Sequence, residues 1–198
     1  MYNQIRVFSV CILLFASCRP AQYVPKPPGY YKLDTPAEHK YKLFDEPGCP
    51  YTFEYPEYSI IGTDSSDLSA KEPESKYWIN IYFPDLSGII NITYKNITKE
   101  QPLDKLNAEA FEMSFFHHEK AEYMDHTEFL NQQGIDCVVY TLGGNVATRY
   151  QFTATDTVKH FIRGALYFDV TPNADSLKPV SDFVERDIEH MLQTLKWR

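Results

Sequence analysis

Cys18 is the residue with the clearest chemical role in this sequence, because of what stands before it. Arg6 places a positive charge near the amino end, and residues 7–16 are almost continuously apolar. This order, closed by small residues, is typical of a secretory signal, and the apolar run is too short to span a membrane as a helix. The sequence FASC at residues 15–18 puts a cysteine where a bacterial lipoprotein signal has one. We therefore predict that residues 1–17 are a lipoprotein signal peptide and that the thiol of Cys18 is lipidated.

Lipidation would anchor the mature chain to a membrane without a membrane-spanning segment. Two or three acyl chains hold a protein far more firmly than one. An ordinary signal peptide that happens to be followed by a cysteine is the alternative, since Phe15 stands where leucine is commonest in lipoprotein signals. The membrane, reached through the N-terminal lipid, is the first partner that the sequence predicts.

Two cysteines remain once the signal peptide and the lipidated residue are set aside. Cys11 leaves with the signal, so Cys49 and Cys137 are the thiols of the mature domain. Export would place them in an oxidising compartment, where a disulfide between them could form and would close a long loop. Two separately buried thiols are the alternative, because Cys137 falls within an expected strand and small thiols are common in cores. The sequence leaves both alternatives open.

Asp156, His160 and Arg163 are the nearest approach to a catalytic cluster in the chain. On a regular strand, however, His160 and Arg163 point to opposite faces. A histidine on an apolar strand face is usually a hydrogen-bonded core residue. The sequence also has no GxSxG, no phosphate-binding glycine loop and no CxxC. We predict that the protein is not an enzyme and has no catalytic residue.

Three further histidines, His117, His118 and His126, lie close together in the sequence. Neighbouring residues on a helix diverge by about 100°, so these side chains would not converge on one ion. No HExxH motif is present, and we predict neither a metal site nor a cofactor. The formal charge of −8 gives no basic face, which argues against nucleic acid as a partner.

Residues 18–42 are predicted to be a lipidated cysteine followed by a tether. Pro25, Pro27 and Pro28 exclude helix and inner strand, and they stiffen the segment. Large aromatic side chains flank the prolines, and an inert spacer would not need them. Because aromatic residues are enriched at interface hot spots, they are candidate partner-binding residues. These residues are Tyr23, Tyr30 and Tyr31.

The remaining residues, 43–198, predict a single α+β domain. A strand at 51–55, a hairpin at 77–97 and a meander of strands at 128–170 indicate an antiparallel sheet of about six strands. In the last strand of the meander, one face is expected to consist of every second residue from His160 onward.

Two helices should pack on this sheet. The apolar spacing predicts one helix over residues 103–122 and a second helix near the C-terminus. For the second helix, Ser176 is a plausible cap, and Pro179 would sit in the first turn, where its missing N–H does no harm. Trp197, one residue from the end, should lie against the core.

Five segments of the chain are long and distinctive. They are CPYTFEYP at 49–56, WINIYFP at 78–84, HFIRGALYF at 160–168, DSLKPV at 175–180 and YVPKPPGY at 23–30. Together they resemble the GldD gliding-motility lipoproteins of Bacteroidota, over nearly the whole chain. The resemblance implies a non-catalytic, lipid-anchored accessory component of gliding motility, linked to type IX protein secretion, that acts through contacts with other envelope proteins. The order of elements also resembles the PsbP/Mog1 fold, an antiparallel sheet with helices packed on it.

The resemblance also bears on location. Arg19-Pro20-Ala21 after the lipidated cysteine lacks the lysine and acidic run that resembles a surface-export signal in this phylum. We therefore expect a periplasm-facing lipoprotein of the cell envelope, on either the inner or the outer membrane. A periplasmic hydrolase and a small-ligand-binding lipoprotein are the alternatives.

Two short motifs resemble the Asp-(Ser/Thr)-aliphatic O-glycosylation signal of the same phylum. They are Asp156-Thr157-Val158 and Asp175-Ser176-Leu177, and both fall in expected turns. Thr157 and Ser176 are therefore candidate O-glycosylation sites.

Overall fold

The computed structural model describes residues 35–63, 73–118 and 121–198, with the side chains of 115–118 left out. An antiparallel sheet of seven strands organises this part of the chain. Its strands follow the spatial order β3-β4-β5-β9-β8-β7-β6. They are β3 (Ile60–Thr63), β4 (Ile79–Phe83), β5 (Gly88–Asn96), β9 (His160–Phe168), β8 (Thr148–Thr155), β7 (Asp136–Gly143) and β6 (Tyr123–Leu130).

The predicted hairpin and meander are both confirmed in this sheet. The strands β4 and β5 pair directly through the short turn η3 (Pro84–Leu86), and β6 to β9 follow one another as antiparallel neighbours. The hairpin and the meander form a single sheet because β5 pairs with β9, which is distant from it in sequence. Tyr77, expected in the strand of β4, instead ends the 3-10 turn η2 (Ser75–Tyr77), where its N–H bonds to Glu74 O.

The main sheet has seven strands where about six were expected, and a second, smaller sheet adds three more. It has the order β1-β2-β10, formed by β1 (Tyr41–Phe44), β2 (Tyr51–Pro56) and β10 (Lys196–Trp197). The chain end thus pairs with a strand near its start, and Trp197 packs against the core as predicted. Tyr41 and Lys42, the last residues of the expected tether, are part of β1.

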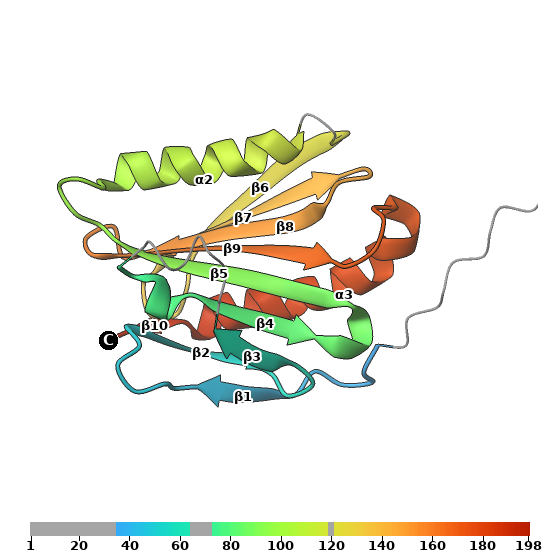
Figure 1. The fold of residues 1–198 in the computed structure, drawn as a ribbon, viewed down its shortest axis with the longest axis horizontal. Coiled ribbons are helices and arrows are strands. Elements are labelled where there is room, and N and C mark those ends of the chain that lie inside the picture. The colour runs from blue at the N-terminus through green and yellow to red at the C-terminus, as the bar shows by residue number, and fades with distance from the viewer. Residues whose placement is uncertain (1–34, 64–72, 119–120) are drawn as a thin grey trace, which may run out of the picture. The chain divides into compact units, whose positions relative to one another are not determined.

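Two helices lie on opposite faces of the seven-stranded sheet, α2 (Leu103–His118) and α3 (Ala174–Thr194) (Figure 1). The alternation of β9 shows this directly. Phe161 packs with Leu106 and Ala110 of α2, whereas Ile162 belongs to the large core that includes α3. The face expected from His160 onward is therefore confirmed as the core face.

Both helices differ from the sequence-based boundaries. The helix α2 ends at His118 rather than at residue 122. The helix α3 begins earlier than expected, because Asn173 rather than Ser176 is its cap: the Asn173 side chain accepts a hydrogen bond from the Ser176 N–H. Pro179 consequently lies in the second turn, and its ring is exposed to solvent.

The main core fills the space between the seven-stranded sheet, α3 and β2. Tyr51 and Phe53 of β2 are buried, as are Val184 and Ile188 of α3. Gly164 on β9 makes this packing possible, because a Cβ there would lie 2.0 Å from the Phe152 ring. Within the residues that the structure describes, no helix is long and apolar enough to cross a membrane.

Candidate functional site

The predicted anchor and the predicted aromatic contacts of the tether lie outside the described residues. Cys18, Tyr23, Tyr30 and Tyr31 all precede Thr35, the first residue that the structure describes. The first described contacts of the site therefore lie where the tether enters the domain.

A buried carboxylate marks this entry point. Asp187 of α3 is 1% exposed, and it lies opposite the residues that lead into β1. Its Oδ1 accepts a hydrogen bond from the Tyr41 hydroxyl at 3.0 Å and lies 2.7 Å from His39 Nδ1. Its Oδ2 accepts a second tyrosine hydroxyl, that of Tyr58. We call His39, Tyr41, Tyr58 and Asp187 the tether root.

Aromatic stacking extends the tether root along α3. The His39 ring stacks on Phe183 at 4.2 Å, and the Tyr41 ring stacks on His190 at 3.6 Å. His190 Nε2 lies 2.7 Å from Glu54 Oε2 of β2. Burial and the neighbouring Asp187 carboxylate raise the pKa of the Tyr41 hydroxyl, which therefore stays protonated and able to donate.

The position of Asp187 on α3 is the one sequence signal for this site. Val184, Ile188 and Met191 form the apolar stripe of α3, and Asp187 falls within that stripe rather than on a solvated face. A charged residue in such a position needs partners. Nothing in the local pattern, however, indicates that those partners come from residues 39–58.

The Asp156, His160 and Arg163 side chains do not form a catalytic cluster. Asp156 Oδ1 accepts hydrogen bonds from the backbone N–H groups of Val158, Lys159 and His160, and so closes the turn between β8 and β9. Burial opposes the charge of Asp156, but these three hydrogen bonds and nearby His160 outweigh it and lower the pKa of the carboxyl. Asp156 is thus occupied by the backbone.

His160 is a hydrogen-bonded core residue, as its strand position predicts. Its Nδ1 lies 2.6 Å from the hydroxyl of Tyr94, and its ring stacks on Trp197 at 4.9 Å. Burial lowers the pKa of the imidazole, with Asp156 acting in the opposite direction. The ring therefore joins β5, β9 and β10 rather than facing a cleft.

Arg163 lies on the other face of β9, beneath α2. Its Nη2 donates to Gln151 Oε1 at 2.6 Å, and the Ser114 hydroxyl of α2 donates to the same oxygen at 3.2 Å. Gln151 and Ser114 are each 1% exposed. Gln151 Nε2 and Arg163 Nε are buried without a hydrogen-bond partner among the described residues.

The cysteines of the domain are both buried free thiols. The disulfide that the sequence left open is therefore not formed in this structure. Burial raises the pKa of the Cys137 thiol to about 12, and it also raises the pKa of Cys49. Neither residue has the depressed pKa of a reactive thiol.

The two candidate glycosylation sites have different surroundings. Thr157 is exposed in the turn between β8 and β9, where its φ of 63° lies in the left-handed region. Ser176 is half-buried in the first turn of α3, and its hydroxyl donates to Asn173 O at 3.2 Å. A transferase needs an accessible hydroxyl, so the surroundings favour Thr157 over Ser176. Modification at either residue stays a prediction.

Two hollows are large enough to hold a small molecule. One, of about 600 Å³, is lined by the β1–β2 connection around Cys49 together with Ile61 and Tyr77. The other, of about 580 Å³, has mostly apolar walls that include Ile60, Tyr82 and Ile89. Across the described ranges, no group of three or more histidine, cysteine or acidic side chains is placed to hold a metal ion, and His126 lies on the exposed strand β6.

Comparison with solved structures finds likenesses at low identity. The chain is similar to cyanobacterial PsbP (CyanoP) from Synechocystis sp. PCC 6803, with a TM-score of 0.48 and 10% identity over 82% of this chain and 95% of that one. It is also similar to the Ran-binding protein Mog1p of Saccharomyces cerevisiae, with a TM-score of 0.45 and 10% identity over 81% of this chain and 96% of that one. The order of elements expected from the sequence resembles the fold named after these same two proteins. At 10% identity, neither likeness says anything about function.

Comparison at the level of sequence families is more specific. No curated protein sequence matches the chain significantly. The family model described as gliding motility lipoprotein GldD, by contrast, matches residues 20–197. This match spans all of the described domain except its last residue, and it extends back through the tether to within two residues of Cys18. The chain therefore belongs to the GldD family of gliding motility lipoproteins.

Proposed function

We propose that this protein is a non-catalytic, lipid-anchored accessory component of the gliding machinery, linked to type IX protein secretion. The family match over residues 20–197 is the observation that carries the proposal. The protein acts through contacts with other envelope proteins, and the lipid on Cys18 keeps those contacts close to the membrane. The anchor, the tether of residues 18–42 and the domain of 43–198 have separate roles in this scheme.

The tether root supports a mechanical link between anchor and domain. His39 and Tyr41 contact a buried carboxylate on α3, and α3 is packed into the main core. Because of these contacts, the chain leaves the domain at a defined place rather than from a free end. An anchored contact protein benefits from this, because a fixed exit limits the orientations of the domain toward the membrane.

Gene deletion with complementation tests the proposal. Deletion in a gliding bacterium should abolish spreading and reduce secretion of type IX cargo, and the wild-type gene should restore both. A Cys18→Ala variant should fail to restore them, and it should leave the detergent phase or accumulate as precursor. Cys11→Ala is the matched control, because the signal peptide carrying it is removed. Normal spreading and secretion in the deletion strain would refute the function.

The tyrosines of the tether need a separate test. Replacing Tyr23, Tyr30 and Tyr31 by Ser should leave the melting temperature of the protein nearly unchanged and should impair gliding and recovery of crosslinked partners. A large fall in melting temperature would mean that the tether packs on its own domain. Unchanged gliding together with unchanged stability would make the tether a spacer only.

The periplasmic orientation is tested by protease treatment of whole cells. The protein should resist protease in intact cells and be digested once the outer membrane is permeabilised. Density-gradient separation of the two membranes then assigns the anchor to one of them. Digestion in intact cells would place the domain on the cell surface and contradict this part of the proposal.

A further inference from the structure

The sheet face beneath α2 differs in chemistry from the core face. The register of the sheet aligns Asn80, Asn91, Ala165 and Gln151 in one row across β4, β5, β9 and β8. In the next row, Thr93 pairs with Arg163, and Arg163 pairs with Thr153. Polar side chains therefore occupy the centre of this face, where a sheet covered by an amphipathic helix normally presents aliphatic ones.

Arg163 is a cation without an acidic partner in the described part of the chain. None of the ion pairs between described side chains includes it, and its hydrogen-bond partners are the neutral amide oxygen of Gln151 and the side chain of Tyr167. Its Nε and the adjacent Gln151 Nε2 are buried donors with no acceptor among the described residues. Both atoms are buried too deeply for a docking partner to reach, but the Arg163 side chain as a whole is only half-buried. A guanidinium recognises a carboxylate through a planar fork of N–H groups.

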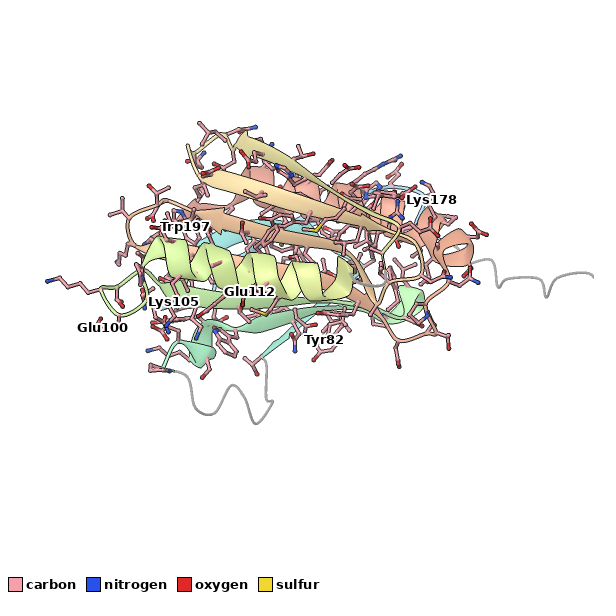
Figure 2. The ribbon with its side chains drawn as sticks, turned by 90° about the horizontal axis from the view of Figure 1, so that it is seen from above. Tyr82, Glu100, Lys105, Glu112, Lys178 and Trp197 are labelled. Atoms are coloured by element: carbon pink, nitrogen blue, oxygen red, sulfur yellow. The ribbon has the colours of Figure 1, made fainter. Side chains whose placement is uncertain are left out.

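The same face continues beyond α2 as an open platform. The helix packs over β7, β8 and β9, and Figure 2 shows Tyr82 of β4 outside the area that it covers. Tyr82 is 39% exposed, and Asn91 and Tyr167 are partly exposed beside it. We call Tyr82, Asn91 and Tyr167, together with Arg163, which is half-buried beneath α2, the platform.

Hydrogen bonds and packing hold the platform in shape before any ligand arrives. Asn91 donates to Asn80 Oδ1 at 2.8 Å, and Asn80 donates to the Tyr82 hydroxyl at 3.2 Å. The Tyr82 ring lies over Gly62, where an added Cβ would approach it to 3.0 Å. Fixed side chains lose little conformational entropy on binding, which favours tight association.

We propose that the platform is the surface on which a partner envelope protein docks, and that this partner presents an aspartate or glutamate side chain to Arg163. The inference rests on the proposed function and assigns its contact surface. A protein suits the platform better than a small molecule, because Tyr82 borders one of the two large hollows but Asn91, Tyr167 and Arg163 line neither, and the platform lies on a sheet surface. Tyrosine and arginine are also the residue types enriched at interface hot spots.

Site-specific photocrosslinking in living cells tests this surface. Benzoylphenylalanine is placed at Tyr82 in the full-length, lipidated protein, and Val158, 76% exposed in the turn after β8, is the control position. Position 82 should give a product with another envelope protein that position 158 does not give. Arg163→Met should reduce this product about thirty-fold, the effect of a hot-spot residue. Arg163→Lys should also reduce it, because lysine lacks the planar fork.

The partner's residue and the stability of the variant complete the test. Mass spectrometry of the product should map the crosslink near an acidic residue of the partner, and replacing that residue by its amide should cause a similar loss. The melting temperature of the purified Arg163→Met protein should stay equal or rise, because the substitution removes a buried charge that has no acidic partner. A marked fall in melting temperature would show that Arg163 is structural and overturn the proposal.

Two other outcomes would also overturn it. The crosslink from position 82 could join acidic residues of the same chain that lie outside the described ranges, such as Asp64, Asp67 or Glu119, which would make Arg163 an internal contact. The product with the partner could survive Arg163→Met, which would place the contact elsewhere. In both cases the proposed function stands, because it is tested by the deletion phenotype and not by this surface.

Discussion

The helices α2 and α3 cover the same sheet from opposite sides, yet they are held in different ways. The helix α3 contributes five large apolar side chains that are at most 4% exposed. These are Val180, Val184, Ile188, Met191 and Leu192. The helix α2 contributes Leu106 and Ala110 to a small cluster around Phe161, and its Phe111 and Met113 are about half exposed.

The two sides also differ in how well their buried polar groups are satisfied. On the α3 side, Asp187 is fully provided with donors by His39, Tyr41 and Tyr58. On the α2 side, Gln151 and Arg163 keep buried donors without acceptors among the described residues. The comparison indicates that the α3 side provides stability and that the α2 side is built at some expense of stability, as binding surfaces often are.

The strongest test of this contrast is a cavity in the α3 side. Ile188→Ala should lower the free energy of unfolding by about 3–4 kcal/mol, because Ile188 is 1% exposed and tightly packed. Urea denaturation followed by circular dichroism measures the change. The control is Glu189→Ala on the adjacent, exposed position, which should change stability by less than about 0.5 kcal/mol.

The tether root should be the next most sensitive feature. Asp187→Ala removes the acceptor of three donors, so we expect a loss of about 2–3 kcal/mol in the free energy of unfolding. Glu189→Ala on the same helix is again the control, since that side chain is exposed. Equal effects of the two substitutions would show that the tether root does not hold the chain.

A cavity under α2 should cost less than one under α3. Leu106→Ala should lower the free energy of unfolding by about 2 kcal/mol, the lower end of the range for buried leucine, because its cluster is small and the helix can settle. Amide hydrogen exchange should show earlier local opening of α2 than of α3 in the wild-type protein. A loss as large as that of Ile188→Ala would remove the distinction between the two sides.

The smallest expected effect is a pH dependence from the core histidine. Burial depresses the pKa of His160 in the folded state, so the unfolded chain binds a proton that the folded chain refuses. Stability from this group is complete above the ordinary histidine pKa, and it falls as the pH drops through that value. Between about pH 7.5 and 5.5 the loss should be below about 1 kcal/mol.

His160→Gln should reduce that pH dependence relative to the wild type. Denaturant titrations of both proteins at the two pH values give the difference directly. An unchanged dependence in His160→Gln would mean that the depressed pKa does not contribute to stability.

Local periodicity was enough to predict most of the fold. The stripe of Val184, Ile188 and Met191 indicates a helix because its spacing repeats within the segment. Strand alternation likewise predicted which residues of β9 share a face, and it predicted His160 to be a hydrogen-bonded core residue. The boundary errors at Ser176 and Tyr77 arose because a cap and a 3-10 turn depend on single hydrogen bonds rather than on a repeated pattern.

The candidate site was predicted less completely, for a physical reason. In the sequence, Arg163 stands close to His160 and Asp156, whereas in the fold it donates a hydrogen bond to Gln151 on the next strand. The platform joins β4, β5 and β9, and it exists only after β5 pairs with β9 across the sheet. Sequence spacing cannot show such a row, because it depends on the register between distant strands.

The sequence by itself determined the features that follow from local patterns: the hairpin, the meander and the apolar helix at the C-terminus. The signal before Cys18 and the proline-rich tether come from the same kind of pattern and stay predictions. Only the tertiary structure decided the pairing of Trp197 with β2 and the enclosure of Asp187 by residues 39–58. The β10 strand has only two residues, too few to show a pattern. The residues that donate to Asp187 lie more than a hundred positions before Asp187 in the sequence. Such contacts form because the folded sheet brings the two ends of the domain together. A local pattern cannot show which distant residues become neighbours in space.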